Sequence, residues 1–457
     1  MTDSSSKYTV PSQTRLHSAV IKIGGGPLID DRRVLSQRRI DEAVAMVEAV
    51  KSHVDHLYIV VGGAGAHFYI ELARGYGASE AESDDIGIMA TQLASLVLLS
   101  ALRRRIFDLY PGIAMSLVEI EQAGRSYGAV IVGPLQKAAT SSDSVAALTA
   151  EHVNAEALVI VKAWHLGDRV PVEGSKGGTL VCARLEDVID KVRPHTELAG
   201  KRPILDMACL RILQRVRYRT FVVPVDELGS LSRLAEPHSL SAVEVVSDLQ
   251  RSRAAAFGKL RPVLPILLER ARELVRGLDD VVHDFGHIAR CASTAMLIGS
   301  TYPYANSAII EIGAWWHDVG RLEGPADHEA RSADMLAREL ERAGADESVV
   351  QEFAEAVAFH KWSMRPSSLE GKVIRDADKL DAVAPERWRF WDAAASNGVI
   401  VPESELCSVS EIASDLDNLI SLKSALQLLR VRRSELRELL PNLKDEKVRR
   451  FAVLAAN

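Results

Sequence analysis

The 457-residue sequence lacks several features that mark specialised classes of protein. It has four cysteines and no C-x-x-C pair, so we expect neither a disulfide framework nor a cysteine zinc site, and a cytoplasmic location fits. Its net charge of -7 argues against a basic surface for nucleic acid. Because we find no run of about 18 apolar residues and no apolar segment in the first 15 positions, we expect no membrane span and no signal peptide.

The first half of the chain alternates short apolar runs with helical patterns. The runs "SAVIKIGG", "HLYIVVGGAG", "GAVIVG" and "EALVIVKA" are rich in β-branched residues, and three of them run directly into glycine. Such runs predict buried strands, and the helical segments between them predict crossovers. This alternation predicts an α/β domain over residues 18–235, with a mainly parallel sheet covered on both faces.

The pattern becomes almost entirely helical after about residue 237. We expect a flexible tail over residues 1–17, a linker helix over 236–262, a helical domain over 263–400 and further helices over 401–457. The basic residues of the last segment are most simply explained as a solvated helix face. The chain is therefore predicted to combine an α/β domain with an all-α domain.

Histidine and aspartate recur where the apolar faces of the helices are interrupted. A buried histidine costs desolvation energy unless it is hydrogen-bonded or bound to a metal. A single one is usually a satisfied core residue, but five clusters on successive segments favour a divalent metal site, with Mn, Co, Ni, Fe or Mg as the ion. The clusters are His283 with Asp284 and His287, His317 with Asp318, His328, His360, and Asp376 with Asp378 and Asp381.

The order of these clusters resembles that of the HD-domain metal-dependent phosphohydrolases, an all-helical superfamily. The resemblance covers roughly residues 265–395 and includes the segments "HDFGHIAR" and "DADKLDA". It implies metal-ligand roles for His287, His317, Asp318 and Asp378. It also implies that Asp318 takes part in catalysis. Asp378 is preferred to Asp376 because the family's ligand lies two residues before the last leucine. His328 and His360 match positions that bind a second metal or the substrate phosphate in some members.

Glycine-rich turns follow two of the predicted strands. Lys22 precedes Gly24, Gly25 and Gly26, and a second turn contains Gly62, Gly63 and Gly65. Glycine lets backbone N–H groups approach an anion closely, although tight turns also use it for structural reasons alone. Two such turns with a lysine favour a polyphosphate site. The sequence has no G-x-x-x-x-G-K-[ST] motif, so the site is not a P-loop.

Residues 18 to about 230 resemble the amino-acid-kinase fold, closest to uridylate kinases and molybdenum storage proteins. The segments that carry the resemblance include "IKIGGGPLID", "IVVGGAGAHFYIELARGYG" and "TSSDSVAALTAEHVNAEALVIVK". The resemblance implies an α/β sandwich, a homo-oligomer and ATP with Mg as cofactor. It further implies that Lys22 and Lys162 stabilise the transferring phosphoryl group, that Asp143 orients them, and that backbone N–H groups of the turns bind phosphate; the glycines are Gly24, Gly25, Gly62, Gly63 and Gly65.

Three departures from the uridylate kinase pattern bear on the substrate. Ser95 replaces an asparagine, "AWHLGDRVPVEG" replaces the adenine-side segment, and "GPLQKAAT" replaces a G-T-G-x-P segment. These departures disfavour UMP as the acceptor. Three interpretations remain open: a phosphohydrolase of nucleotides or small phosphate esters joined to a kinase-like binding domain, an active small-molecule kinase with an accessory hydrolase, and a non-catalytic oxyanion storage or sensor protein.

Overall fold

A computed structural model describes residues 14–135, 141–163, 165–173, 180–192, 205–278, 282–361 and 363–457. It divides into two compact units, an α/β unit over residues 14–252 and a helical unit from residue 253 to the C-terminus. Residues 1–13 of the predicted N-terminal tail lie outside the described residues. The end of that prediction is wrong, because Leu16 and His17 are buried in the first strand, where the apolar run begins two residues earlier than predicted. The predicted combination of an α/β domain with an all-α domain is confirmed.

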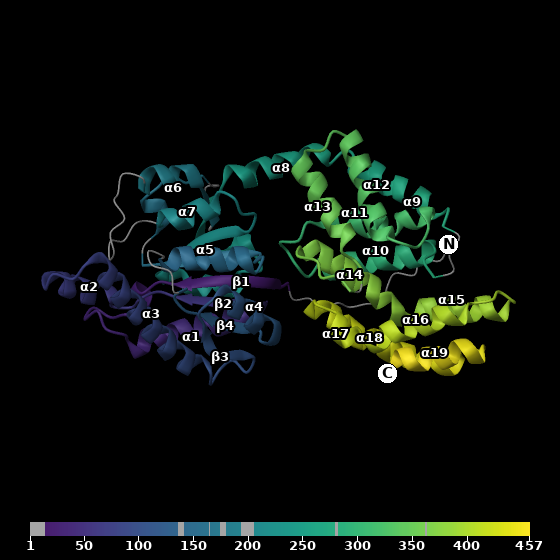
Figure 1. The fold of residues 1–457 in the computed structure, drawn as a ribbon, viewed down its shortest axis with the longest axis horizontal. Helices are drawn as coiled ribbons and strands as arrows, with labels where there is room; N and C mark the ends of the chain where they lie inside the picture. The colour runs from purple at the N-terminus through teal and green to yellow at the C-terminus, as the bar shows by residue number, and fades with distance from the viewer. Residues whose placement is uncertain are drawn as a thin grey trace. The chain divides into compact units, whose positions relative to one another are not determined.

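The α/β unit is built on an eight-stranded sheet with the order β3-β4-β2-β1-β5-β7-β8-β6 (Figure 1). Every neighbouring pair is parallel except β7 with β8, which is antiparallel. The sheet is therefore mainly parallel, as predicted. Its strands are β1 (Leu16–Ile23), β2 (Val54–Val61), β3 (Leu109–Ala114), β4 (Ala129–Val132), β5 (Ala157–Lys162), β6 (Leu180–Arg184), β7 (Arg219–Pro224) and β8 (Ala242–Val246).

Helices cover both faces of this sheet (Figure 1). Helices α4 to α7 bury one face around Val60, Leu158 and Ile160, while α1 and α3 pack on the other. Both faces of the central strands are thus apolar, which explains why β1 is buried along its whole length. The helices are α1 (Gln37–Lys51), α2 (Ala66–Gly75), α3 (Glu80–Leu102), α4 (Leu117–Ser126), α5 (Ser142–His152), α6 (Leu185–Val192) and α7 (Met207–Leu213).

The predicted linker helix over residues 236–262 is wrong in its first half. Residues Ala242–Val246 form β8, which pairs with β6 and β7, and helix α8 (Asp248–Leu260) begins after it. The sequence "AVEVV" alternates β-branched residues with a polar one, and pairing on both sides of the strand outweighs the helical character of the residues around it. Helix α8 then continues from the α/β unit into the helical unit.

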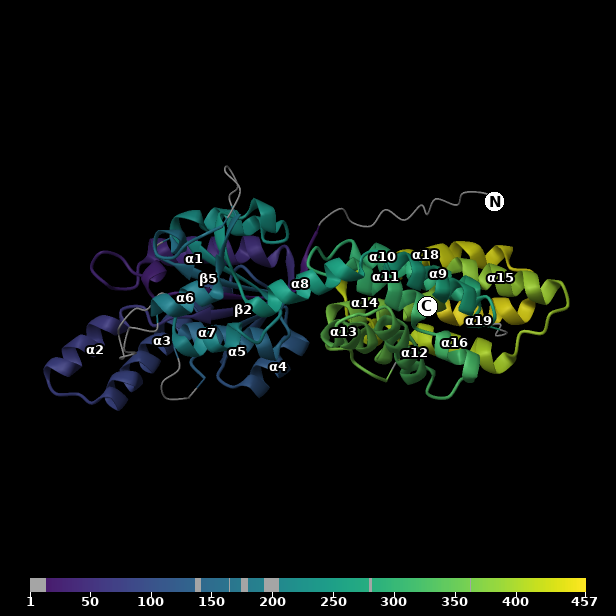
Figure 2. The same cartoon turned by 90° about the horizontal axis from the view of Figure 1, so that it is seen from above.

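The helical unit has one continuous apolar core. Residues from α9 to α19 contribute to it, including Trp316, Trp388 and Phe353, and the helices after residue 401 share the same core. Helices α12 and α13 pack side by side (Figure 2). The helices are α9 (Leu264–Val275), α10 (Phe285–Gly299), α11 (Ser307–Trp316), α12 (His328–Arg342), α13 (Glu347–Ala358), α14 (Leu369–Leu380), α15 (Pro385–Ser396), α16 (Glu403–Ser414), α17 (Leu416–Leu419), α18 (Lys423–Leu439) and α19 (Glu446–Ala456).

Helix α3 is long and apolar enough to cross a membrane by length and composition alone. Within the fold, however, it packs on the sheet through Leu98, Leu99 and Leu102, and a Ser79–Glu82 capping box fixes its start. The buried share of its apolar stretch is 28%. The apolar surface of α3 therefore exceeds what the sheet of this unit covers.

Candidate metal centre and candidate phosphate site

His317 and Asp318 lie at the end of α11, in the centre of the helical unit. The helix sequence "SAIIEIGAWW" is apolar on nearly every side, and seven of its ten residues are buried. His317 follows as the C-terminal capping residue, and Asp318 begins the turn into a short 3-10 helix, Val319–Glu323. A largely apolar helix thus brings the two polar side chains that follow it into the core, where both are almost completely buried.

Three histidines of the predicted set are oriented in the same way by the backbone. In each case Nδ1 lies within hydrogen-bond distance of the carbonyl oxygen three residues earlier: His317 on Ala314 at 2.7 Å, His328 on Pro325 at 2.9 Å, and His360 on Val357 at 2.6 Å. A carbonyl only accepts, so Nδ1 carries the proton and Nε2 presents a lone pair. Among the described residues, His317 Nε2 has no hydrogen-bond partner although it is buried.

Helix α10 supplies the fourth histidine. Asp284 caps the helix by accepting from the backbone N–H of His287 at 2.8 Å, so Asp284 has a structural role at the start of the helix. His287 Nε2 lies 3.6 Å from Asp318 Oδ2 and 3.5 Å from Asp378 Oδ1. His287 Nδ1 lies 2.8 Å from a different carboxylate, Asp381 Oδ2.

The two oxygens of Asp318 face different histidines. Oδ2 lies 3.6 Å from Nε2 of both His287 and His317. Oδ1 lies 3.0 Å from His328 Nε2 and 3.6 Å from His360 Nε2. Two groups of possible ligands therefore meet at Asp318. The first comprises His287, Cys291, His317 and Asp378. The second comprises Asp318 itself with His328 and His360.

The two candidate aspartates of α14 have different environments. Asp378 Oδ1 lies 3.5 Å from His287 Nε2 and 3.9 Å from His317 Nε2. Asp376 instead accepts from the backbone N–H groups of Ser421 at 3.0 Å and Leu422 at 2.8 Å, so it ties the later helices to the core. The geometry thus brings Asp378 to the histidines and directs Asp376 away from them.

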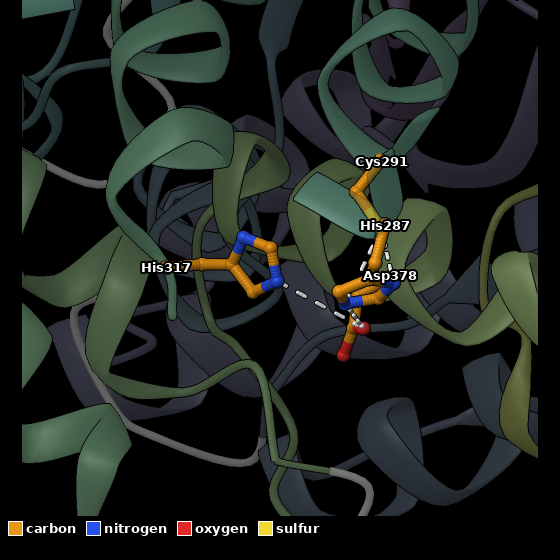
Figure 3. Close-up of side chains that lie close together, drawn as sticks. All are labelled: His287, Cys291, His317 and Asp378. Atoms are coloured by element: carbon orange, nitrogen blue, oxygen red, sulfur yellow. Dashed lines mark hydrogen bonds and ion pairs between the residues drawn. The ribbon is translucent and has the colours of Figure 1, made fainter. Parts of the chain in front are cut away.

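Figure 3 shows the first group, in which the His317 ring points toward His287 and Asp378. Cys291, one turn after His287 on α10, was not predicted to lie here; its Sγ is 3.5 Å from His287 Nδ1 and 3.7 Å from Nε2. An i, i+4 spacing from a candidate ligand is a sequence signal that indicates this proximity. Asp381 and Arg387 were also missed as neighbours of His287, and no local pattern indicates the Arg387 contact.

Three cations beside the cluster are engaged with carboxylates. Arg290 Nε lies 2.7 Å from Asp381 Oδ1, and Lys379 Nζ lies 2.5 Å from Asp378 Oδ2. A third cation, Arg321, has its Nε 3.0 Å from Asp318 Oδ1. These contacts offset the negative charge of the buried carboxylates, which would otherwise repel a phosphate ester.

Burial shapes the charge state of the cluster. Burial lowers the pKa of His317 to about 4, so the imidazole is neutral at pH 7 and its Nε2 lone pair is available. Burial alone would raise the pKa of Asp318, but the surrounding histidines, His317 first among them, hold it well below its usual range. The neutral imidazole of His317 therefore lies beside an ionised carboxylate, that of Asp318.

These residues fit a divalent metal ion. His328 Nε2 and His360 Nε2 face each other at 3.4 Å, and two imidazole lone pairs at this distance repel unless a cation lies between them. Ligand atoms at about 2.1 Å from a tetrahedral ion are separated by about 3.4 Å, close to the separations from 3.0 to 3.9 Å found here. The mixture of imidazole and carboxylate suits a first-row transition ion.

In the α/β unit, Lys22, Asp143 and Lys162 form one buried cluster. Lys22 Nζ lies 2.7 Å from Asp143 Oδ1, and Lys162 Nζ lies 2.7 Å from Asp143 Oδ2. The sheet register explains why the two lysines lie close together. Lys22 on β1 pairs with Ile160 on β5, two residues before Lys162. Burial alone would raise the pKa of Asp143, but the two ammonium groups hold it well below its usual range. Burial lowers the pKa of Lys22.

The two glycine turns lie against each other next to this cluster. A Cβ atom on Gly25 would come within 2.5 Å of the Gly63 carbonyl oxygen, and one on Gly62 would come within 2.8 Å of the Gly25 backbone nitrogen. A Cβ on Gly24 would lie 3.4 Å from Lys22 Nζ. Gly65 has a φ of +76° where it caps α2, a conformation that favours glycine. The structure thus brings the predicted glycines and both lysines to the C-terminal ends of the central parallel strands.

The departures from the uridylate kinase pattern fall partly within the described residues. Ser95 is buried in α3, and its hydroxyl donates to the Thr91 carbonyl of the same helix at 2.8 Å. The predicted altered segments at 133–140 and 163–174 are described only in part, because residues 136–140, Trp164 and Gly174 lie outside the described residues. His67, which sits on α2, has its Nε2 3.0 Å from Glu71 Oε1.

Comparison with known proteins matches both halves of the chain. Residues 18–164 match the amino acid kinase family, and residues 284–383 match the HD domain. A uridylate kinase from Haloquadratum walsbyi is 31% identical over 206 residues, which cover 45% of this chain and 83% of that protein. A solved uridylate kinase from Archaeoglobus fulgidus is 22% identical with a TM-score of 0.40, covering 50% of this chain and 99% of its own. A predicted HD superfamily hydrolase from an uncultured Thermotogales bacterium is 25% identical with a TM-score of 0.30, covering 39% and 89%.

Proposed function

The chain belongs to the amino acid kinase family through its α/β half and carries an HD domain in its helical half, and from this premise we propose a bifunctional architecture. The helical domain, residues 263–400, is a metal-dependent phosphohydrolase of a nucleotide or another small phosphate ester. The α/β domain, residues 18–235, binds a nucleotide or related polyanion. The observation that carries the hydrolase proposal is the buried His317 Nε2, which lacks a hydrogen-bond partner among the described residues and faces two carboxylates and His287.

The proposed metal ligands are His287, His317, Asp318 and Asp378, with His328 and His360 available for a second ion. Mn, Co, Ni or Fe suits this imidazole-rich set better than Mg, which prefers oxygen ligands. When bound, such an ion lowers the pKa of a coordinated water and supplies a hydroxide nucleophile. Asp318 then fixes the spacing of the two ligand groups because its two oxygens face different histidines.

The test of the hydrolase proposal is metal-dependent turnover of a panel of phosphate esters. Full-length protein is stripped of metal, supplied with each divalent ion in turn and assayed on nucleoside mono-, di- and triphosphates and on sugar phosphates. We expect hydrolysis that requires a transition ion. Failure of every ion to bind would overturn the metal site, and binding without hydrolysis of any ester would overturn the catalytic assignment.

The α/β domain is proposed to bind ATP or a related polyanion at the glycine turns. Lys22 and Lys162 carry two positive charges against the single negative charge of Asp143, so the cluster has one positive charge left for an anion. Backbone N–H groups of the turns at Gly24, Gly25, Gly63 and Gly65 add donors for phosphate oxygens. The predicted role of Gly62 as a donor is wrong, because its N–H donates to the Ile23 carbonyl at 2.8 Å. Ser95 and the altered segments argue against UMP as the acceptor.

A second candidate function is phosphoryl transfer by the same domain. Phosphoryl transfer depends mainly on positioning and charge neutralisation, and the Lys22–Asp143–Lys162 cluster supplies both. The test is ATP turnover with a panel of small hydroxyl, carboxyl and phosphate acceptors. Transfer that is lost in Lys22→Ala would favour the kinase over the binding role. The storage interpretation would be favoured by oxyanion binding with neither activity.

We also propose that the chain forms a homo-oligomer through α2 and α3. Both helices expose large apolar side chains, and Met89, Leu93 and Leu96 recur on α3 at helical spacing. Lipid would cover such a face as well, but α3 also packs on its own sheet, so a second copy of this chain is the simpler partner. A cytoplasmic location remains a proposal that fits the scattered cysteines.

A further inference from the structure

His287 differs from the other three histidines of the cluster in what holds its Nδ1. His317, His328 and His360 use carbonyl oxygens of their own backbone three residues earlier. His287 lies in the first turn of α10, and its Nδ1 meets the side chain of Asp381, 94 positions away in the chain, at 2.8 Å. The orientation and the proton position of this ring therefore depend on a tertiary contact.

Two groups of opposite hydrogen-bonding character compete for this nitrogen. Asp381 Oδ2 lies 2.8 Å from Nδ1, and Arg387 Nη2 lies 2.7 Å from the same atom. A carboxylate accepts and a guanidinium donates, so Nδ1 can satisfy one of them at a time. If Nδ1 donates to Asp381, the Nε2 lone pair faces Asp318 and Asp378. If Nδ1 accepts from Arg387, the proton moves to Nε2 and blocks coordination.

Asp381 is held as an ionised carboxylate, the form that accepts hydrogen bonds. It is completely buried, and its oxygens lie 2.7 Å from Arg290 Nε and 2.7 Å from Arg387 Nε. Two guanidinium groups at this distance keep the carboxylate ionised and fix both of its oxygens. Arg387 Nη2 is also 2.5 Å from Asp381 Oδ2, so its protons have a better acceptor than the imidazole.

We infer that Asp381 is a positioning residue for the metal centre, an inference that rests on the proposed function. It holds the proton of His287 on Nδ1 and so directs the Nε2 lone pair to the point shared by His317 and Asp378. Arg290 and Arg387 orient Asp381, and Asp381 in turn accepts the protons of Arg387 that would otherwise be donated to Nδ1. Carboxylate support of this kind typically changes metal affinity 10–100-fold.

The test is a Co²⁺ titration of metal-free full-length protein, followed by the visible d–d absorption of the ion. Asp381→Asn is the informative variant, because it removes the negative charge that binds both guanidinium groups, and an NH₂ at the position of Oδ2 would face Nδ1 and favour the wrong tautomer. Asp376→Asn is the matched control: it is an equally buried aspartate five positions earlier that binds Ser421 and Leu422. His317→Ala reports on the proposed site itself.

We expect Asp381→Asn to bind Co²⁺ about 10–100-fold more weakly, with a changed d–d spectrum, while Asp376→Asn binds as the wild type does. Wild-type affinity and spectrum in Asp381→Asn, with binding lost in His317→Ala, would overturn the inference and leave the hydrolase proposal standing. Wild-type binding in His317→Ala would overturn both. If Asp381→Asn does not fold, ¹⁵N spectra of Zn²⁺-loaded wild-type protein decide, because a His287 coordinated through Nδ1 contradicts the inference.

Discussion

The two units bury charge in opposite ways. In the α/β unit, both oxygens of Asp143 meet an ammonium group at 2.7 Å, and the cluster retains one positive charge. In the helical unit, imidazole lone pairs converge on carboxylate oxygens, and His317 Nε2 has no partner among the described residues. An unpaired buried polar group is costly in a low-dielectric interior. The excess positive charge of the first cluster therefore suits an anion. The converging lone pairs and carboxylate oxygens of the second suit a cation.

Removal of a proposed metal ligand tests the cation side of this comparison and should have the largest effect. We expect His317→Ala and Asp378→Ala to lower metal content and to reduce phosphate-ester hydrolysis by at least about 100-fold, since even residues that only support ligands cost 10–100-fold. Elemental analysis and hydrolysis rates measure the two effects. Lys22→Ala is the matched control, because it removes a buried charge of the other unit and should leave hydrolysis largely intact. Full hydrolysis in both ligand variants would contradict the prediction.

ATP binding tests the anion side. A ligand that binds the folded state at 100 times its Kd stabilises it by about 2.7 kcal/mol, which shifts a melting curve measurably. We expect ATP to protect the α/β unit in the wild type and in Asp378→Ala, but not in Lys22→Ala. Differential scanning fluorimetry with and without ATP measures the shift. Equal protection in Lys22→Ala would separate the lysine from the nucleotide site.

Surface substitutions on α3 test whether the α/β unit differs from the helical unit in self-association as well. Leu93→Glu places a charge in the exposed apolar stripe with Met89 and Leu96, and we expect it to shift an oligomer toward monomer. Light scattering at micromolar concentrations measures the mass. Val431→Glu, at an exposed valine of the helical unit, should leave the mass unchanged. A monomeric wild type would remove the proposed interface.

Much of the fold could be predicted from local patterns. The glycine stops after apolar runs marked β1 and β2 correctly, because a buried parallel strand is nearly continuous in β-branched residues. Strand β8 was missed because its neighbours in sequence are helical, while its pairing partners β6 and β7 lie far along the chain or across a loop. A strand between two others is specified by tertiary pairing more than by its own five residues.

The candidate site also has a part that could be predicted from the sequence and a part that could not. The order of the histidine and aspartate clusters identified the residues that converge, because each cluster lies in or at the end of a helix whose buried apolar face can be predicted. The contacts that orient them could not be predicted in the same way. The Asp381–His287–Arg387 arrangement joins three elements 94 and 100 positions apart, and its charges compensate one another only after folding. Asp376 and Asp378 have the same chemistry in sequence and differ only in what faces them.

Glu370 offers a smaller test of how the helical unit tolerates a buried carboxylate away from the metal cluster. Its Oε1 accepts from the Asn306 backbone N–H at 2.7 Å, but burial raises its pKa above the usual value of 4.5 despite that bond and the nearby Arg253. A folded pKa above the unfolded one means that the folded state holds the proton more tightly. The stabilising contribution of this group is therefore fully present below pH 4.5 and is lost as pH rises through the folded pKa.

Glu370→Gln removes this titration while it keeps an oxygen for the Asn306 N–H. We expect the variant and the wild type to have similar unfolding free energies near pH 4, and the variant to become the more stable as pH rises above 4.5, because only the wild type must then bury a charge. Denaturant unfolding across this pH range measures the difference. Glu341→Gln, at an exposed position on α12, should give a difference that does not change with pH. A Glu370→Gln difference that is equally flat would mean that Arg253 already compensates the buried carboxylate, against both its burial and the repulsion from Glu352.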